Sequence, residues 1–259
     1  MAITEVKSSA KSKRMEEAEK FSSGESVDEH AHREDIPFEC CGTSEGAMIW
    51  CVSTDISGIV LASLVWLMIL FSAFVCIMIM RFEKNGNYNI YNGYAILFLI
   101  FMSLWSHGAT MLGDPGAVPS NARPLAKDVE NGEPPPVCDR GKCGYTYKPP
   151  GSHHDKNSNR CISRMDHFCP WTNNAVGAKN QKNFFLFLIY TFLASMYLYV
   201  LLGINLIHCK SLSCDSTNTA AIYVVRTEVV ILLFGVIFTF SMIVNQAYNL
   251  ASGLTHIDR

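Results

Sequence analysis

A polar stretch between residues 137 and 177 concentrates the cysteines and histidines of this 259-residue chain. Near its centre His167 precedes Cys169 by two residues, and Asp166 directly precedes the histidine. A free thiol has a pKa of about 8.5 and is mostly protonated near pH 7, so it needs a base to act as a nucleophile. An imidazole can take that proton, and a carboxylate can orient the imidazole. The three residues can form an activated thiol, but their spacing is equally compatible with metal ligation by Cys169 or His167.

A second group of residues in the same stretch has the spacing of a zinc site. Cys138 and Cys143 have four residues between them, and His154 and Cys161 follow. Structural zinc is bound tetrahedrally by cysteine thiolates and histidine nitrogens at such spacings. The stretch is rich in Gly, Pro, Asn and Lys and has almost no apolar core of its own. The spacing therefore favours a Cys₃His zinc site that fixes the shape of this loop.

Two pairs of apolar segments flank the polar stretch, at about residues 56–80 and 91–112 and at about 184–207 and 229–250. Each segment is close to the roughly 20 residues that cross the hydrocarbon core of a membrane. Within the spans we expect no deeply placed ionisable residue, which argues against an ion pathway. The pattern predicts an all-α membrane protein with four transmembrane helices and a cysteine-rich loop domain between the second and third.

Basic residues are distributed unevenly among the loops. Residues 113–183 contain ten Lys and Arg residues, whereas the two short turns contain two and one. Because basic loops stay in the cytosol, the large loop and both termini are expected there. The net charge of −2 and the lack of a basic stripe predict no nucleic-acid partner.

The composition divides the chain into five segments. The first is rich in charge and serine and poor in aromatic residues, so it is expected to be a disordered tail. The segments are a cytosolic tail at 1–45, helices at 46–112, the cytosolic cysteine-rich catalytic domain at 113–183, helices at 184–250 and a cytosolic C-terminal segment at 251–259.

The other cysteines allow several interpretations. Cys40 and Cys41 directly precede the first span, where S-acylation is possible but unmodified thiols are the default. Cys51 is interpreted as a small buried hydrophobic residue. Cys209 and Cys214 would lie in the oxidising lumen, where a disulfide and two free thiols are equally favoured.

From about residue 40 to residue 259 the chain resembles the DHHC protein S-acyltransferases, or palmitoyltransferases. Residues 160–174 resemble the signature motif of that family, here with Asp-His-Phe-Cys at its centre. Residues 114–116 resemble its DPG motif, residues 180–185 the start of its third span, and residues 255–258 a relaxed TTxE motif.

The resemblance implies a mechanism. Cys169 would accept a fatty acyl group from acyl-CoA as a thioester and pass it to a cysteine of a membrane-associated protein. His167 would be the base and Asp166 would orient it. We expect an endomembrane location, Golgi or ER, while the span lengths suit the plasma membrane as well. The alternative is a catalytically inactive membrane adaptor whose zinc-stabilised loop binds partner proteins.

The resemblance also places the acyl chain in a cavity among the four spans. Ala194 and Ser195 are small and lie about midway along the third span. We expect them to leave room for a chain of palmitate length or longer. Together with Trp171 they are the residues expected to contact palmitoyl-CoA.

Family members usually bind two zinc ions, each through three cysteines and one histidine. The first site corresponds to Cys138, Cys143, His154 and Cys161, all present. The positions of the second site hold no cysteine or histidine, so we expect a single structural zinc and apolar packing in place of the other. Those positions are Asp155, Ser158, Phe168 and Ala175.

Overall fold

The structure is a computed structural model that describes residues 39–45, 47–52, 55–82, 90–124, 135–143, 146–211 and 219–258. The predictions about the tail ahead of residue 39 and about Cys214 concern residues outside these ranges.

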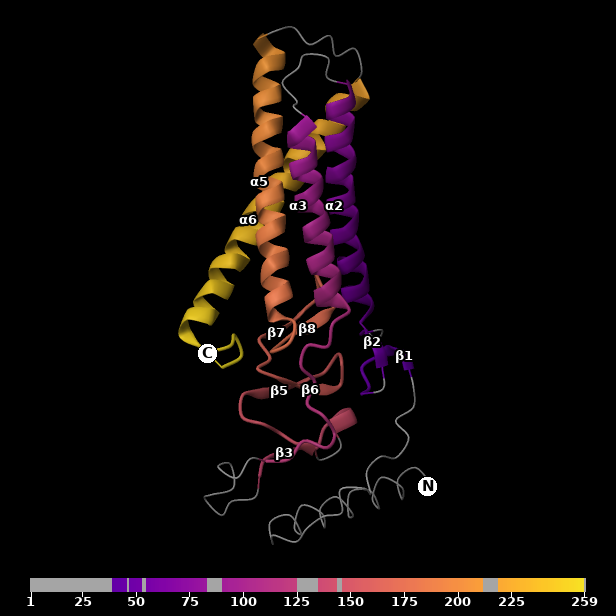
Figure 1. Cartoon of the computed structure of the whole chain (residues 1–259), viewed down its shortest axis with the longest axis vertical. Helices are drawn as coiled ribbons and strands as arrows, with labels where there is room; N and C mark the ends of the chain where they lie inside the picture. Colours follow the sequence, from indigo (N-terminus) through magenta and orange to yellow (C-terminus); the bar gives the residue numbers. More distant parts are fainter. Residues whose placement is uncertain are drawn as a thin grey trace.

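Four long helices form the body of the molecule (Figure 1). Each contains an apolar segment long enough to cross a membrane, which confirms the predicted four spans. Large apolar side chains such as Leu67 and Phe98 point outward from the bundle, as lipid contact requires. The helices are α2 (Ile56–Phe82), α3 (Ile90–Met111), α5 (Gln181–Ser211) and α6 (Thr219–Ser252).

The bundle is held by packing between neighbouring helices. α5 packs against α3 and α6, and α2 packs against the same two helices. Ser103 of α3 and Thr191 of α5 share a hydrogen bond of 2.6 Å. Figure 1 shows α6 crossing the bundle obliquely. The core between the helices includes Ile96, Ile100, Phe187, Leu188 and Leu232.

The last helix differs from the sequence-based expectation. α6 begins at Thr219, ten residues before the predicted start of the fourth span, so Glu228 lies inside the helix. Glu228 is only 1% exposed. The sequence placed Glu228 at the entry of the fourth span, whereas in the structure it lies inside the apolar segment Tyr223–Ser252, near its start. Hydropathy indicates where apolar residues begin, whereas a helix can extend through polar residues beyond them.

The cysteine-rich region lies at one end of the bundle, where α3 ends and α5 begins (Figure 1). Here the prediction of an all-α fold needs correction, because short antiparallel hairpins build this region. Gly and Pro interrupt the chain too often for helices but permit tight turns. The hairpins pair β3 (Val137–Cys138) with β4 (Thr146–Tyr147), β5 (Ser152–Asp155) with β6 (Arg160–Ser163), and β7 (His167–Cys169) with β8 (Asn174–Val176). A short 3₁₀ helix, η1 (Gly141–Cys143), follows β3.

A further pair of strands precedes α2. β1 (Glu39–Gly42) and β2 (Ala47–Trp50) run parallel, and we call residues 39–52 the juxtamembrane loop. A disulfide joins Cys41 and Cys51, whose Cα atoms are 5.7 Å apart, while Cys40 is exposed and free. The interpretations of Cys41 as a free thiol and of Cys51 as a buried hydrophobic residue are therefore wrong. Strand pairing brings the two residues together, which their separation in sequence did not indicate.

Candidate active site and metal centre

The four predicted zinc ligands meet in one cluster, which we call the metal cluster. Cys138 comes from β3, Cys143 from η1, His154 from β5 and Cys161 from β6, and their ligand atoms all lie within 4.8 Å of one another. His154 Nδ1 is 3.5 Å from Cys138 Sγ and 3.4 Å from Cys143 Sγ. Zinc bonds of about 2.3 Å to sulfur and about 2.0–2.1 Å to nitrogen give a tetrahedral S···N spacing of about 3.6 Å. The donor set therefore fits zinc.

Hydrogen bonding within the metal cluster favours a thiolate. The Cys161 thiol is the main donor to Cys143, and although burial opposes it, this bond together with His154 lowers the pKa of Cys143 to about 5. The backbone N–H of Cys161 also donates to Cys143 Sγ, at 3.1 Å. Zinc binds thiolates rather than thiols, so this environment suits a metal ligand.

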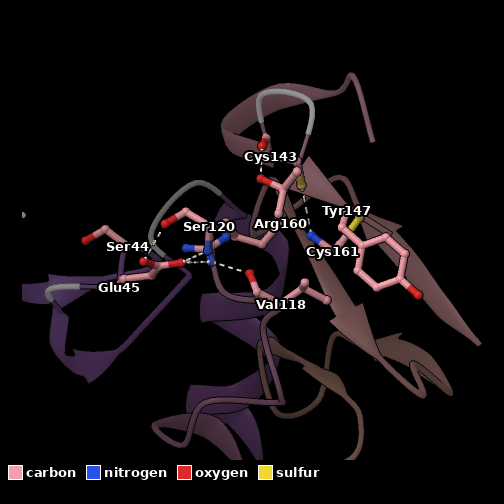
Figure 2. A pocket seen from close by; sticks show the side chains of 9 residues that line it. Ser44, Glu45, Val118, Ser120, Cys143, Tyr147, Arg160 and Cys161 are labelled. Carbon is pink, nitrogen blue, oxygen red and sulfur yellow. Dashed lines mark hydrogen bonds and ion pairs between the residues drawn. The ribbon is translucent and has the colours of Figure 1, made fainter. Parts of the chain in front are cut away.

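Arg160, beside the metal cluster, ties β6 to the juxtamembrane loop (Figure 2). Its guanidinium donates to the carbonyl oxygens of Thr43, at 3.1 Å, and Val118, at 2.8 Å, and forms an ion pair of 3.2 Å with Glu45. Glu45 in turn accepts a hydrogen bond from the Ser120 hydroxyl at 2.9 Å. These partners belong to the juxtamembrane loop and to the segment around Val118, so Arg160 connects both of them to strand β6.

The predicted nucleophile and base lie on strand β7. Alternate residues of a strand point to the same face, so His167 and Cys169 share one face and Phe168 points to the other. His167 Nδ1 donates to Asp166 Oδ2 at 2.9 Å, which leaves Nε2 as the nitrogen that can exchange a proton with Cys169. This Nε2 is buried without a nitrogen or oxygen partner among the described residues. Cys169 is 3% exposed and packs with Phe184 and other bundle residues.

Asp166 is fully buried and held by more partners than His167. Gln246 Nε2 donates to it at 2.6 Å and Asn249 Nδ2 at 2.9 Å, both from α6, and the backbone N–H of His256 donates at 2.6 Å. Sequence analysis missed Gln246 and Asn249. Two amides three residues apart on one helix face, directly after a long apolar run, were the signal that could have revealed them.

The electrostatics of this pair favour charge on both residues. Burial raises the pKa of Asp166, but the hydrogen bonds from His167, Gln246 and His256 outweigh it and hold the pKa at about 2. Burial likewise lowers the pKa of His167, but Asp166 and Cys169 outweigh it and raise the pKa to about 9. Near pH 7 the pair is therefore a carboxylate and an imidazolium.

The TTxE-like segment completes the support for Asp166. The Thr255 hydroxyl donates to Asp258 Oδ2 at 2.7 Å. Asp258 Oδ1 lies 3.1 Å from Nε2 of His153 on β5. These contacts fix the turn that presents the His256 N–H to Asp166.

The buried side chain of His107 contacts the turn that follows Cys169. The indole N–H of Trp66 donates to His107 Nδ1 at 2.8 Å, and His107 Nε2 lies 2.9 Å from the carbonyl oxygen of Trp171. An indole N–H only donates and a carbonyl only accepts, so both bonds require neutral imidazole with its proton on Nε2. His107 thus joins α2, α3 and the turn, a role that sequence analysis did not identify.

An apolar cavity lies between α2, α5 and α6. Of the three residues predicted to contact palmitoyl-CoA, Trp171 and Ser195 line this cavity, whereas Ala194 is buried but is not among the lining residues. Gly235 of α6 faces Ser195 so closely that a Cβ on it would lie 2.9 Å from the serine hydroxyl oxygen. Cys169 packs in the same apolar core as Phe187, which also lines the cavity. Trp171, two residues after Cys169, lines the cavity, so the hairpin that carries the thiol reaches it.

The four positions of the expected second zinc site have other roles. The Asp155 carboxylate accepts a hydrogen bond of 2.8 Å from the Ser158 N–H and shapes the turn between β5 and β6. Phe168 and Ala175 are paired across β7 and β8. They pack into what we call the apolar cluster, formed by Trp50, Ile162, Met165, Phe168 and Ala175.

Comparison with known proteins agrees with this arrangement. A family described as DHHC palmitoyltransferase matches residues 140–259. Palmitoyltransferase ZDHHC3 of Rattus norvegicus is 34% identical over 213 residues, covering 79% of this chain and 71% of the relative. Palmitoyltransferase ZDHHC7 of Mus musculus is 34% identical over 220 residues, covering 82% and 70%. Probable protein S-acyltransferase 13 of Arabidopsis thaliana is 44% identical over 110 residues, covering 37% and 36%. The chain belongs to the DHHC palmitoyltransferase family.

Proposed function

We propose that this membrane palmitoyltransferase moves a long-chain acyl group from acyl-CoA to protein cysteines through a thioester on Cys169. One observation carries the proposal. Cys169 shares a strand face with His167, whose partner Asp166 is fixed by α6, and its hairpin reaches an apolar cavity through Trp171. A thiol, a base and a place for an acyl chain are thus assembled at one point.

The charged state of the pair suggests the order of proton transfers. His167 takes the proton of the Cys169 thiol, the sulfur attacks the carbonyl carbon of acyl-CoA, a new C–S bond forms, and the C–S bond to CoA breaks. The leaving CoA thiolate takes the proton of His167, whose pKa of about 9 keeps it protonated near pH 7. His167 then takes a proton from the substrate cysteine, whose thiolate attacks the acyl group and releases Cys169. Asp166 orients the imidazole throughout.

The cavity supports a preference for long chains. Each CH₂ moved from water into an apolar site is stabilised by about 0.8 kcal/mol. Ser195 and Gly235 both line the cavity, and a Cβ on Gly235 would already lie 2.9 Å from the Ser195 hydroxyl oxygen, so a larger side chain at Gly235 has to occupy the cavity or push the helices apart. In a competition among acyl-CoAs we expect chains of palmitate length or longer to be preferred, and Gly235→Leu to shift the preference to shorter chains. A sharp preference of the unaltered chain for short acyl-CoA would contradict the assignment.

The metal cluster supports one structural zinc per chain, held by Cys138, Cys143, His154 and Cys161. When bound, zinc supplies cross-links between hairpins rather than chemistry, because four protein ligands leave no open position. Metal analysis of purified protein is expected to give about one zinc per chain, and about two would contradict the proposal.

The distribution of basic residues supports an orientation with the cysteine-rich region and both termini in the cytosol. The membrane that we propose is that of the Golgi or the ER. Membrane-impermeant thiol labelling of intact vesicles, with the exposed Cys40 as the reporter, tests the side. Labelling from the lumen alone would contradict this orientation.

The decisive test is acylation of Cys169. Purified protein given labelled palmitoyl-CoA is expected to acquire a label that hydroxylamine removes, and Cys169→Ser is expected to abolish it. Cys40→Ser removes an exposed free thiol and is the matched control that keeps the label. If the unaltered chain takes up no such label, the acyltransferase mechanism fails and the adaptor function takes its place.

A further inference from the structure

The juxtamembrane loop contacts the strand opposite the nucleophile. Trp50, at the end of β2, is 6% exposed, and its indole N–H donates to Asn174 Oδ1 at 2.9 Å. Asn174 begins β8 and is the register partner of Cys169 on β7. A residue outside the cysteine-rich region thus bonds to the residue across the hairpin from Cys169.

Asn174 has a single satisfactory orientation. Its Nδ2 donates to the carbonyl oxygens of Thr110 and Gly113, both at 2.9 Å, just where α3 ends. The amide oxygen, Oδ1, accepts a hydrogen bond from the indole N–H, which can only donate. Asn174 is fully buried, so removing the indole N–H leaves a buried oxygen without a partner.

The ring of Trp50 adds packing to this hydrogen bond. It belongs to the apolar cluster with Ile162, Met165 and Ala175, on the side of β7 and β8 away from His167. A second bond from the loop reaches the same turn, because Asn173 Nδ2 donates to the carbonyl oxygen of Val52 at 2.8 Å. The disulfide from Cys41 to Cys51, the residue after Trp50, closes the loop.

We propose that Trp50 is a positioning residue for acyl transfer, acting through Asn174 on Cys169. This inference rests on the proposed role of Cys169. Trp50 does not line the apolar cavity; it fixes the hairpin through its hydrogen bond to Asn174 and through its packing against Phe168 and Ala175. Displacing a reacting group by about 1 Å can lower a rate by up to about 100-fold, so a contact one residue across the hairpin can control the chemistry.

The test compares Trp50→Phe with Trp105→Phe, which alters an outward-facing tryptophan that is 67% exposed. Trp50→Phe keeps most of the ring and removes the N–H. We expect the maximal rate of Cys169 acylation to fall about tenfold. The half-saturating concentration of palmitoyl-CoA should stay within about twofold of the unaltered chain, because Trp50 does not line the cavity. Zinc content should match that of Trp105→Phe, and the melting temperature should fall by only a few degrees, the effect of one unpaired buried oxygen.

A double-mutant cycle separates positioning from general stability. In an Asn174→Ala background, Trp50→Phe is expected to have no further effect on the rate, because Trp50 acts on Cys169 only through Asn174. Additive losses, an unchanged rate in Trp50→Phe, or a change confined to half-saturation each overturn the inference. If Asn174→Ala does not fold, Trp50→Phe alone decides: a lower maximal rate at an unchanged half-saturating concentration supports the inference, and any other result overturns it. An unaltered chain that never labels Cys169 refutes the proposed function instead.

Discussion

The metal cluster and the apolar cluster solve the same problem by different physics. Both join short hairpins that have too little surface to be stable separately. Strand β6 serves both, because Cys161 points into the metal cluster while the next residue, Ile162, points into the apolar cluster. One side of the region is joined by ligand groups and the other by packed side chains around Trp50.

This difference determines which conditions destabilise the metal cluster and which destabilise the apolar cluster. Thiolate and imidazole ligands must be deprotonated, so the metal cluster is sensitive to acid and to chelators. Apolar packing has neither sensitivity, and its strength follows the area removed from water. The hairpin that carries Cys169 contacts the apolar side through Phe168 and Ala175. Its position therefore depends less on metal than that of β3 to β6.

The largest expected effect comes from removing a ligand. Cys161→Ser should reduce bound zinc from about one per chain to near zero and remove the stabilisation of β3 to β6, since structural zinc binding is worth about 10–16 kcal/mol in small peptides. Metal analysis and thermal melting provide the measurements. Cys40→Ser, at an exposed free cysteine, should keep both values. Full zinc retention in Cys161→Ser would mean that another residue completes the site.

A smaller loss is expected one residue further along β6. Ile162 is 0% exposed, and Ile162→Ala should lower the free energy of unfolding by about 2–5 kcal/mol through lost packing and a cavity. Zinc content should stay at the unaltered level. Denaturant unfolding followed by metal analysis of the same sample tests both statements, and a variant that loses zinc would show that the two clusters form one unit.

Chelation should separate the two sides directly. With a strong zinc chelator, amides in β5 and β6 are expected to exchange hydrogen for deuterium at least tenfold faster, whereas β7 and β8 keep most of their protection. The hairpin remains bonded to α3 through Asn174. Simultaneous loss of protection in all four strands would contradict the distinction.

The smallest expected effect concerns pH. The folded pKa of His167, about 9, exceeds its ordinary value of 6.5. Its contribution to stability is therefore fully present below about pH 6.5 and is lost as the pH rises through about 9. His167→Gln should melt about 4 °C lower than the unaltered chain at pH 6, and the gap should close by about pH 10. His256→Gln, which changes an exposed side chain, should show no gap at either pH.

Local features of the sequence allowed much of the molecule to be predicted. Span length is a local property, so the four helices followed from apolar composition. The ligands Cys138, Cys143, His154 and Cys161 were recognisable because zinc sites use short spacings and few residue types. The alternation of strand β7 also explains why Phe168 can differ from the family motif, since its side chain faces away from Cys169.

Contacts between distant segments could not be predicted. Trp50 and Asn174 are 124 positions apart, and Gln246 is 80 positions from Asp166. The disulfide between Cys41 and Cys51 depends on strand pairing in a segment that composition assigned to a tail and the first helices. Such contacts depend on how helices and hairpins pack against one another, which local patterns in the sequence do not indicate.

Helix α6 contributes both to the cavity wall and to the support of Asp166. Thr239 lines the cavity, and Gln246, seven residues later and on nearly the same helix face, donates to Asp166. A residue of the cavity wall and a residue that holds Asp166 are thus carried by one helix, about two turns apart. A displacement of α6 as a whole therefore moves the cavity wall and the support of Asp166 together.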